Sequence, residues 1–196
     1  ELPMKNQKQA KKTITAQEQI ITQTEEKVKK IIKKYDLINK KDKILIALSG
    51  GKDSTTCLHI LNKLKYIIEA FTIDVNIGCY TQQNLENVKK LCEKEKVKLH
   101  VISFRKNYGH SICHAKTTLN EKGLNFNSCT ICGVMRRRLY NLAAKQANAT
   151  KIATGHNMDD EAQSILRNLL KNKQNLNARI TPKQKIINKE LVPRIK

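Results

Sequence analysis

The stretch of sequence that decides the fold is Lys43-Ile44-Leu45-Ile46-Ala47-Leu48-Ser49-Gly50-Gly51-Lys52-Asp53-Ser54. Its first part is an unbroken apolar run, which is the pattern of a strand buried on both faces of a sheet. Its second part combines two adjacent glycines with polar side chains, and a helix is predicted to follow from about Ser54. A buried strand, a glycine turn and a helix are the repeating unit of a parallel α/β sheet.

The chain continues this alternation of strand and helix. Short apolar runs predict further strands, and segments with apolar residues at helical spacing follow them. Such alternation implies right-handed crossovers, so we expect an α/β fold with a doubly wound parallel sheet. The predicted strands are residues 44–48, 70–74, 99–104 and 151–154, and the predicted helices are residues 54–64, 81–95, 134–147 and 159–170.

The N-terminal region has a different pattern. Residues 1–23 are polar and poorly patterned, which is typical of a mobile or loosely packed lead-in. Apolar residues then recur at helical spacing with lysines between them, which predicts an amphipathic helix over residues 25–37. We therefore separate an N-terminal basic, helical segment, residues 1–40, from the α/β domain that begins at residue 41.

The segment Ser49–Ser54, named the glycine loop below, offers a seat for an anion. Adjacent glycines permit backbone angles that other residues disfavour, so consecutive N–H groups can point into one concavity. The helix that follows adds its positive end, Lys52 adds a full charge, and Ser49 adds a hydroxyl donor, as does Ser54. Asp53 is either the N-cap of the helix or a carboxylate beside Mg²⁺. The loop is not a GxxxxGK[ST] loop, because no glycine lies five residues before Gly51.

Candidate binding segments follow two other predicted strands. Asp74 ends one strand, although a turn cap is an equally good interpretation of it. The segment Gly155–Glu161 (Gly-His-Asn-Met-Asp-Asp-Glu) follows another. Ligands of parallel sheets bind at the carboxyl ends of the strands, so we expect these segments and the glycine loop to meet. Asp160 is the candidate Mg²⁺ ligand, although the helix dipole by itself favours acids in this turn. His156 is more often a structural histidine than a base.

The chain is strongly basic, with 38 Lys and Arg against 17 Asp and Glu and a net charge of +21. Such a surface concentrates polyanions. A Lys-rich proteome would raise Lys but would be expected to raise Glu as well, and acidic residues are scarce. Because only 4% of residues are aromatic, a platform that stacks many bases is disfavoured, and we expect a folded RNA bound through its backbone and shape.

We expect a cytoplasmic protein with no membrane partner. No apolar run is long enough to span a bilayer, and no signal-peptide pattern opens the chain. The first residue is Glu1 and the chain stops at Lys196, so we also expect the sequence to be part of a longer one.

Six cysteines are irregularly spaced, which does not indicate a disulfide framework. Cys129 and Cys132 stand at a helix start before the run Arg136–Arg138, and three chemistries fit them. A redox pair would have its thiolates stabilised by the helix N-terminus. A zinc site would add His110 and Cys113, fifteen residues earlier, in zinc-ribbon spacing. An iron–sulfur cluster would need three or four thiolates. From the residues alone, zinc ranks first.

Five segments together resemble a known family. SGGKDS, TIDVNIG, CTICGVMRRRLYN, ATGHNMDDEAQ and VPRIK are similar to the tRNA 2-thiouridine synthetases of archaea and the eukaryotic cytoplasm, over roughly residues 25–196. These are relatives of the tRNA 2-thiocytidine synthetases and members of the PP-loop ATP pyrophosphatases. The resemblance implies an adenine nucleotide alpha-hydrolase-like, ATP-binding domain over residues 41–180, followed by the start of a C-terminal region at 181–196.

The resemblance also implies a reaction, tRNA thiolation by a sulfurtransferase. ATP would adenylate a pyrimidine carbonyl, with C2 of the wobble uridine as the first candidate, and sulfur carried on a [4Fe–4S] cluster would replace the oxygen. Cys129 and Cys132 match two cluster ligands; the family's third cysteine follows the VPRIK segment, and Cys113 is a weaker substitute. The implied catalytic residues are Lys52, Asp53, Asp160, Cys129 and Cys132. The implied nucleotide-binding residues are Ala47, Ser49, Gly50, Gly51, Lys52, Asp53, Ser54, Ile73, Arg136, Gly155 and Asp160.

The implied partners are tRNA and a sulfur donor, either sulfide or a sulfur-carrier protein, and we expect a homodimer. The cysteine-rich zinc fingers usual at the ends of the family are missing. Three alternatives stay open: thiolation of a cytidine or a T-loop uridine, a PP-loop ligase that inserts nitrogen, and a non-catalytic RNA-binding protein with structural zinc. The ligase is disfavoured because amidation needs no soft sulfur-binding site.

Overall fold

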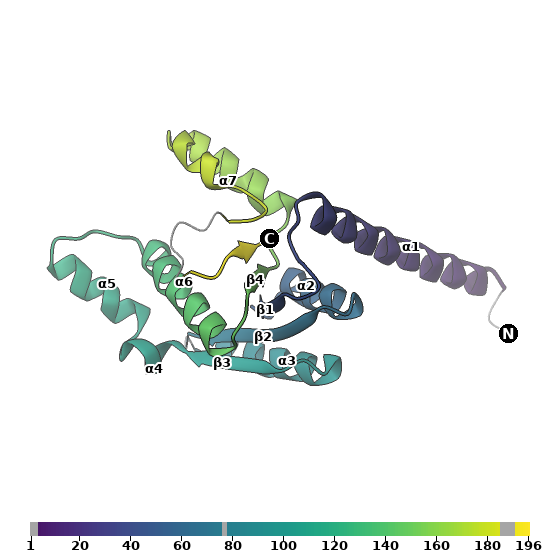
Figure 1. Ribbon diagram of the computed structural model, residues 1–196, viewed down its shortest axis with the longest axis horizontal. Helices are drawn as coiled ribbons and strands as arrows, with labels where there is room; N and C mark the ends of the chain where they lie inside the picture. Colours follow the sequence, from purple (N-terminus) through teal and green to yellow (C-terminus); the bar gives the residue numbers. More distant parts are fainter. Residues whose placement is uncertain (1–3, 76–77, 185–190) are drawn as a thin grey trace. The chain divides into compact units, whose positions relative to one another are not determined.

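The computed structural model describes the backbone of residues 4–75, 78–184 and 191–196. The chain divides into two compact units, residues 1–39 and residues 40–196. The first unit contains α1 (Met4–Lys34). The elements described in the second unit are, in chain order, β1 (Lys43–Ala47), α2 (Lys52–Lys63), β2 (Ile67–Asp74), α3 (Gly78–Glu95), β3 (Leu99–Ser103), α4 (Phe104–Tyr108), α5 (Ile112–Glu121), α6 (Ser128–Gln146), β4 (Lys151–Thr154), α7 (Met158–Leu170), the 3-10 helix η1 (Gln174–Arg179) and β5 (Arg194–Ile195) (Figure 1).

The five strands form one parallel sheet in the order β3-β2-β1-β4-β5, which confirms the predicted α/β class. The central strand β1 pairs with β2 on one side and with β4 on the other. The chain builds outward from β1 to β3 and then returns to add β4 at the opposite edge of β1. The strand order therefore reverses between β1 and β4, and ligands of such sheets bind in the crevice at this reversal.

Helices cover both faces of the sheet, as a doubly wound fold requires. On one face, the buried Leu45, Phe71 and Ile152 form a core with Leu139 and Ala143 of α6. The small alanine side chain lets the helix approach the strands closely. The alternate strand residues point to the other face, where α2 and α3 contact β1 and β2. This sandwich holds the carboxyl ends of the strands in fixed positions.

Helix α1 is longer than the sequence predicted. The lead-in was expected over residues 1–23, of which residues 1–3 lie outside the described part, but α1 runs from Met4 to Lys34. Residues 4–24 contain no Gly or Pro and are rich in Lys and Gln, which favour helix even without an apolar stripe. The side chains of residues 15–24 are exposed, so propensity rather than burial accounts for this part of the helix. Among the described residues, no helix has the length and hydropathy that a membrane crossing needs.

Local signals that periodicity does not reveal explain the other differences. No helix or strand was predicted between residues 104 and 134, yet this stretch contains α4 and α5, each capped by a serine side chain. Helix α6 begins at Ser128 instead of residue 134, because the Asn127 side chain accepts a hydrogen bond from the Thr130 N–H at 2.7 Å. Strand β5 was missed because two residues carry no periodicity. Of the region predicted at 181–196, residues 185–190 lie outside the description.

Glu69 gives the fold a pH-dependent contact. Burial opposes its ionisation, but hydrogen bonds from Lys43 and His100 outweigh burial and hold the pKa of the carboxyl below its usual value. Because the folded-state pKa is lowered, the stabilisation is complete above about pH 4.5 and is lost as the pH falls through the folded-state pKa. We expect Glu69→Gln to lower the free energy of unfolding by about 1–2 kcal/mol at pH 7.

The measurement is urea unfolding between pH 7 and pH 3. The difference between wild type and Glu69→Gln should shrink as the pH falls. Glu121→Gln, at the exposed end of α5, makes the same charge change and should leave the pH dependence unaltered. A constant difference across the whole pH range would contradict the assignment.

Candidate active site

The glycine loop joins the end of β1 to the start of α2. Gly50 has φ +82°, a left-handed conformation that glycine adopts without strain. Helix α2 begins at Lys52, and its N-cap is Gly51, which makes no side-chain capping hydrogen bond. Asp53 is therefore the second residue of the helix, and the interpretation of Asp53 as the N-cap is wrong. Lys52 and Asp53 are both exposed, so their charges are available at the positive end of α2.

The two serines of the glycine loop shape its backbone. The Ser54 hydroxyl is buried; it donates to the Gly51 carbonyl at 2.9 Å and accepts from the Ser49 N–H at 3.3 Å. The Gly51 N–H donates to the Ser49 hydroxyl at 3.4 Å. The single proton of Ser54 is thus used within the loop, although the sequence suggested a donor to an anion. Ser54 acts by holding the loop in its curled form.

Gly155 brings the segment after β4 into contact with the glycine loop. A Cβ on Gly155 would lie 2.6 Å from the backbone nitrogen of Ser54 and 2.7 Å from the backbone carbon of Asp53. No side chain fits at that distance, so the two backbones can pack together only because residue 155 is glycine. Two of the predicted segments therefore meet at the reversal of strand order between β1 and β4.

The end of β2 borders the same loop. Ala47 is aligned with Phe71, so Ile73 and Asp74 extend beyond the end of β1. The Leu48 N–H still donates to the Phe71 carbonyl, at 2.8 Å, which carries the pairing into the loop. All three predicted segments thus leave the sheet at neighbouring strand ends.

Asn84 is a neighbour of the glycine loop that the sequence analysis missed. A Cβ on Gly50 would lie 3.4 Å from Oδ1 of Asn84, which projects from α3. An asparagine within a helix carries no recognisable pattern, and only the packing of α3 beside the loop reveals its position. Its amide adds a polar group to this rim of the site.

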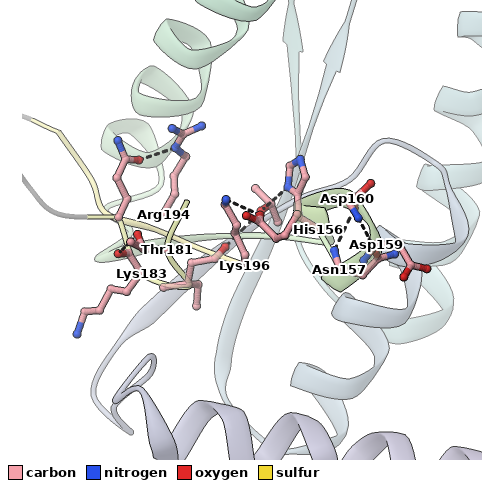
Figure 2. A network of polar contacts seen from close by, with 12 residues as sticks. His156, Asn157, Asp159, Asp160, Thr181, Lys183, Arg194 and Lys196 are labelled. Carbon is pink, nitrogen blue, oxygen red and sulfur yellow. Dashed lines mark hydrogen bonds and ion pairs between the residues drawn. The ribbon is translucent and has the colours of Figure 1, made fainter. Parts of the chain in front are cut away.

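A capping box orders the segment after β4 (Figure 2). The Asn157 side chain accepts from the N–H groups of Asp159 and Asp160, at 3.0 and 3.1 Å. In return, the Asn157 N–H donates to Oδ2 of Asp160 at 3.0 Å. Asp160 therefore has a structural role through one carboxylate oxygen, in addition to the metal role predicted for it.

His156 also has a structural role. The hydroxyl of the buried Thr154 donates its proton to the Ile195 carbonyl at 3.3 Å, so it accepts from Nδ1 of His156 at 2.9 Å. Thr154 thus links the end of β4 to β5, and its hydroxyl holds the ring of His156 (Figure 2). Lys196, after β5, pairs with Oε1 of Glu161 at 2.5 Å in α7. The short strand β5 therefore contributes to the ordering of this segment.

The cysteine pair lies at the same edge of the sheet. In a right-handed crossover between parallel strands the helix runs antiparallel to the strands, so its N-terminus lies at their carboxyl ends. Helix α6 leads into β4 and packs on the sheet in this way, which places its first turn, with Cys129 and Cys132, at the edge where the glycine loop leaves β1. Cys129 is exposed and Cys132 is partly buried.

Arg136 lies one turn further along α6 and supports an anion site. Its Nε is buried and has no hydrogen-bond partner among the residues that the structure describes. A buried guanidinium nitrogen without a partner costs free energy, and a phosphate or carboxylate oxygen would satisfy it. The neighbouring Arg137 instead donates from Nε to the Gly133 carbonyl at 3.0 Å. Arg136 thus keeps a buried donor that a ligand could satisfy.

The structure separates reactive from unreactive cysteines. Burial raises the pKa of the Cys57 thiol to about 11 and that of Cys92 to about 11. These two thiols stay protonated at neutral pH and are poor ligands and nucleophiles. Cys113 and Cys129 are exposed to solvent.

The predicted zinc site is not formed. Within the described residues, no three His, Cys, Asp or Glu side chains are close enough to share a metal ion. Zinc ligands must all lie within about 2.3 Å of one ion, whereas His110 packs edge-on against His114 and Cys113 opens the separate helix α5. The ribbon spacing was misleading because α5 intervenes between the two pairs. The same finding removes Cys113 as a third ligand beside Cys129 and Cys132.

A family model described as the PP-loop domain matches residues 20–192, which includes the glycine loop and the segment after β4. The chain belongs to the PP-loop family. The parallel sheet is therefore the PP-loop fold, and the glycine loop that it carries is called the PP-loop below. Ala47 and Ile73 flank this loop at the strand ends, and Gly155 packs against it.

Relatives of the PP-loop chain include tRNA-modifying proteins. The tRNA-5-methyluridine(54) 2-sulfurtransferase of Pyrococcus horikoshii is 37% identical over 146 residues, covering 74% of this chain and 45% of the relative. The cytoplasmic tRNA 2-thiolation protein 1 of Chlamydomonas reinhardtii is 36% identical over 156 residues, covering 76% and 43%. The structure of the U34-tRNA thiolase NcsA from Methanococcus maripaludis with its [4Fe-4S] cluster matches with a TM-score of 0.65 at 25% identity, covering 82% of this chain and 52% of that one. The chain spans about half the length of these relatives.

Proposed function

We propose that this chain is the ATP-binding and sulfur-transferring part of a tRNA uridine 2-sulfurtransferase. The observation that carries the proposal is the shared edge of the sheet. The PP-loop at the start of α2 and the cysteine pair at the start of α6 both lie at the carboxyl ends of the strands. This shared edge supports one site that combines ATP binding with sulfur binding. The names of the relatives agree with the sulfur chemistry.

ATP would activate the uridine. A ring carbonyl oxygen is a poor leaving group, so its bond to the α-phosphorus of ATP, with loss of pyrophosphate, turns it into a good one. A sulfide sulfur then forms the C–S bond at C2, and AMP leaves with the former carbonyl oxygen. Lys52, the N–H groups of the PP-loop and the α2 dipole stabilise the charge on the departing pyrophosphate. Arg136 supplies a further donor to the nucleotide through its free Nε.

The cysteine pair fits part of the ligand set of an iron–sulfur cluster. Cys129 and Cys132 lie on one turn of α6 and would supply two thiolates. Thiolates are the ligands that such clusters prefer, and the positive helix end stabilises them. A third protein ligand is absent from the described residues, so the set is incomplete within them. When bound, a cluster would hold the transferable sulfur near the activated base.

The partners that we propose are tRNA and a donor of sulfide, and we place the reaction in the cytoplasm. The net charge of +21 supports a polyanionic substrate. The wobble uridine is our first candidate for the modified base, since the thiolase NcsA is a U34-tRNA enzyme. Uridine 54 is the second candidate, because the Pyrococcus relative, at 37% identity, is named for that position. A homodimer remains part of the proposal.

The test is thiolation of tRNA transcripts by the anaerobically purified chain with ATP, Mg²⁺ and sulfide. We expect a 2-thiouridine in the tRNA and equimolar AMP and pyrophosphate. Two further transcripts identify the modified base, one with cytidine in place of uridine 34 and one with cytidine in place of uridine 54. Only the transcript that lacks the target uridine should remain without 2-thiouridine. The wild-type chain should contain iron and acid-labile sulfide. Both should be absent from a Cys129→Ser, Cys132→Ser double variant. Zinc without iron, together with no AMP formation, would exclude the proposal and favour an RNA-binding protein.

Asp160→Asn separates a Mg²⁺ role of Asp160 from its capping role. Asparagine keeps an acceptor oxygen for the Asn157 N–H, so the capping box survives, but the charge that attracts Mg²⁺ is lost. We expect ATP affinity in the presence of Mg²⁺ to fall about tenfold, with a thermal midpoint close to that of the wild type. Titration calorimetry with and without Mg²⁺ measures the first quantity.

Asp159→Asn is the matched control for this prediction. Asp159 is exposed in the same helical turn and would lose the same dipole interaction, worth about 0.3–1 kcal/mol. It should leave the Mg²⁺ dependence of ATP binding unchanged. Equal effects of the two substitutions would show that both carboxylates act only through their interaction with the helix dipole.

A further inference from the structure

Phe126 is exposed where the other phenylalanines are buried. The chain has three phenylalanines and no tryptophan. Phe71 and Phe104 are 1% exposed, whereas Phe126 is 47% exposed. An exposed aromatic ring presents a flat apolar face on which another ring can stack.

The backbone around Phe126 is held by several hydrogen bonds. Gly123, with φ +76°, ends α5, and the Leu124 N–H donates to the Leu119 carbonyl at 2.9 Å. The Phe126 N–H donates to the Leu124 carbonyl at 3.0 Å. Asn127 then caps α6. The ring therefore projects from an ordered connection between two helices.

Phe126 stands directly before the cysteine helix, in a part of the sequence that is rich in basic residues. It precedes the exposed Cys129 by three residues, a separation of at most about 10 Å along the chain. Residues 104–158 contain one acidic residue, Glu121, among nine Lys and Arg. An RNA backbone drawn to this surface would bring its bases within reach of the ring and of the cysteine pair.

We propose that Phe126 is the platform on which the target uridine stacks when it leaves the tRNA stack, an inference that rests on the proposed function. A base inside a stacked RNA cannot present its C2 carbonyl to an active site, and enzymes that modify bases extrude them. Extrusion loses base stacking, and a planar ring beside the reacting groups restores it. The low aromatic content disfavours binding of many bases, but one ring is sufficient for one base.

A purely structural role for Phe126 makes a different prediction. Phe126 precedes the N-cap, where an apolar side chain commonly packs on the fourth residue of the helix, here the buried Ile131. For that role a leucine serves as well as a phenylalanine. Stacking, in contrast, needs the flat face of a ring. Phe126→Leu and Phe126→Tyr therefore distinguish the two roles.

The direct test uses fluorescence, because Phe126→Trp introduces a single tryptophan into a chain that has none. We expect unmodified tRNA transcript to quench this fluorophore saturably, by at least about a third. Leu124→Trp is the matched control, since Leu124 is also 47% exposed and lies two residues away. It should be quenched much less at the same saturation, which a filter-binding assay verifies.

The second test measures thiolation kinetics with tRNA. We expect Phe126→Ala and Phe126→Leu each to lower kcat/KM for tRNA about tenfold to a hundredfold, with ATP affinity unchanged. Phe126→Tyr should retain activity within about threefold, as should Leu124→Ala. Thermal melting checks that each variant is folded.

The outcomes separate this proposal from the proposed function. The stacking role is overturned if bound tRNA does not quench the tryptophan fluorescence of Phe126→Trp. It is also overturned if Phe126→Leu keeps full activity. Neither outcome contradicts the proposed sulfurtransferase function. Selective quenching without any thiolated product supports stacking and overturns the reaction. Failure of tRNA to bind the wild-type chain overturns both.

Discussion

Lys52→Ala is expected to lower the rate of ATP-dependent tRNA thiolation about 100- to 1,000-fold, while the affinity for tRNA changes by less than about threefold. Lys52 is the first residue of α2 and lies beside the N–H groups of the PP-loop. Its charge is therefore placed to stabilise pyrophosphate as it leaves, and one such preorganised contact is typically worth this factor in rate. tRNA affinity comes from many lysines and arginines, of which Lys52 is one among 38 basic residues.

Single-turnover thiolation and filter binding measure the two quantities in parallel. Lys63→Ala removes the same charge at the opposite end of α2 and should leave the rate nearly unchanged. Equal losses of rate and of tRNA affinity in Lys52→Ala would contradict the division between an ATP site and an RNA surface. They would place Lys52 on the RNA-binding surface instead.

Gly155→Ala is expected to weaken ATP binding by more than about tenfold and to destabilise the domain by about 1–3 kcal/mol. The new methyl group would lie 2.6 Å from the backbone nitrogen of Ser54 and 2.7 Å from its Cα. These are backbone atoms of the first turn of α2, so the clash cannot be relieved by rotation of a side chain. Either the segment after β4 or the PP-loop must move. Both segments line the same site, so movement of either one disturbs it.

Gly133→Ala is the matched control for this substitution. A Cβ on Gly133 would meet only the end of the Arg137 side chain, at the ordinary contact distance of 3.7 Å. Because Gly133 lies inside α6, alanine should even stabilise the helix, by up to about 1 kcal/mol. Titration calorimetry and thermal unfolding compare the two variants. ATP affinity and a thermal midpoint equal to the wild type in Gly155→Ala would show that the two backbones do not need this close approach.

The candidate site was partly predictable because its main parts are local in sequence. The PP-loop and the segment 155–161 each combine glycine, polar side chains and a helix start within a few residues. The parallel fold class, confirmed by the order of strands, then places such segments at one edge. Asn84 and the link from His156 through Thr154 to β5 could not be found in this way, since their partners lie far apart in sequence or carry no pattern.

The cysteines show where local spacing misleads. The interval from Cys113 to Cys129 matches a zinc ribbon, yet helix α5 takes up about half of it and the four ligands do not meet. Spacing alone does not describe the path of the chain between two points. Asn127, which caps α6 before Cys129, is a local signal for a helix in place of a ribbon knuckle, and the sequence analysis did not use it.

By itself, the sequence determined the strand–helix alternation, the curled PP-loop and the basic charge, because each depends on residues that are adjacent or on composition alone. The tertiary structure decided which of these features share a site. Gly155 touches Ser54 only because β4 returns beside β1, and the cysteine pair faces the same edge only because α6 runs antiparallel to the strands. Burial, which depends on the whole fold, also decided that Cys57 and Cys92 are unreactive and that Arg136 keeps a donor for a ligand.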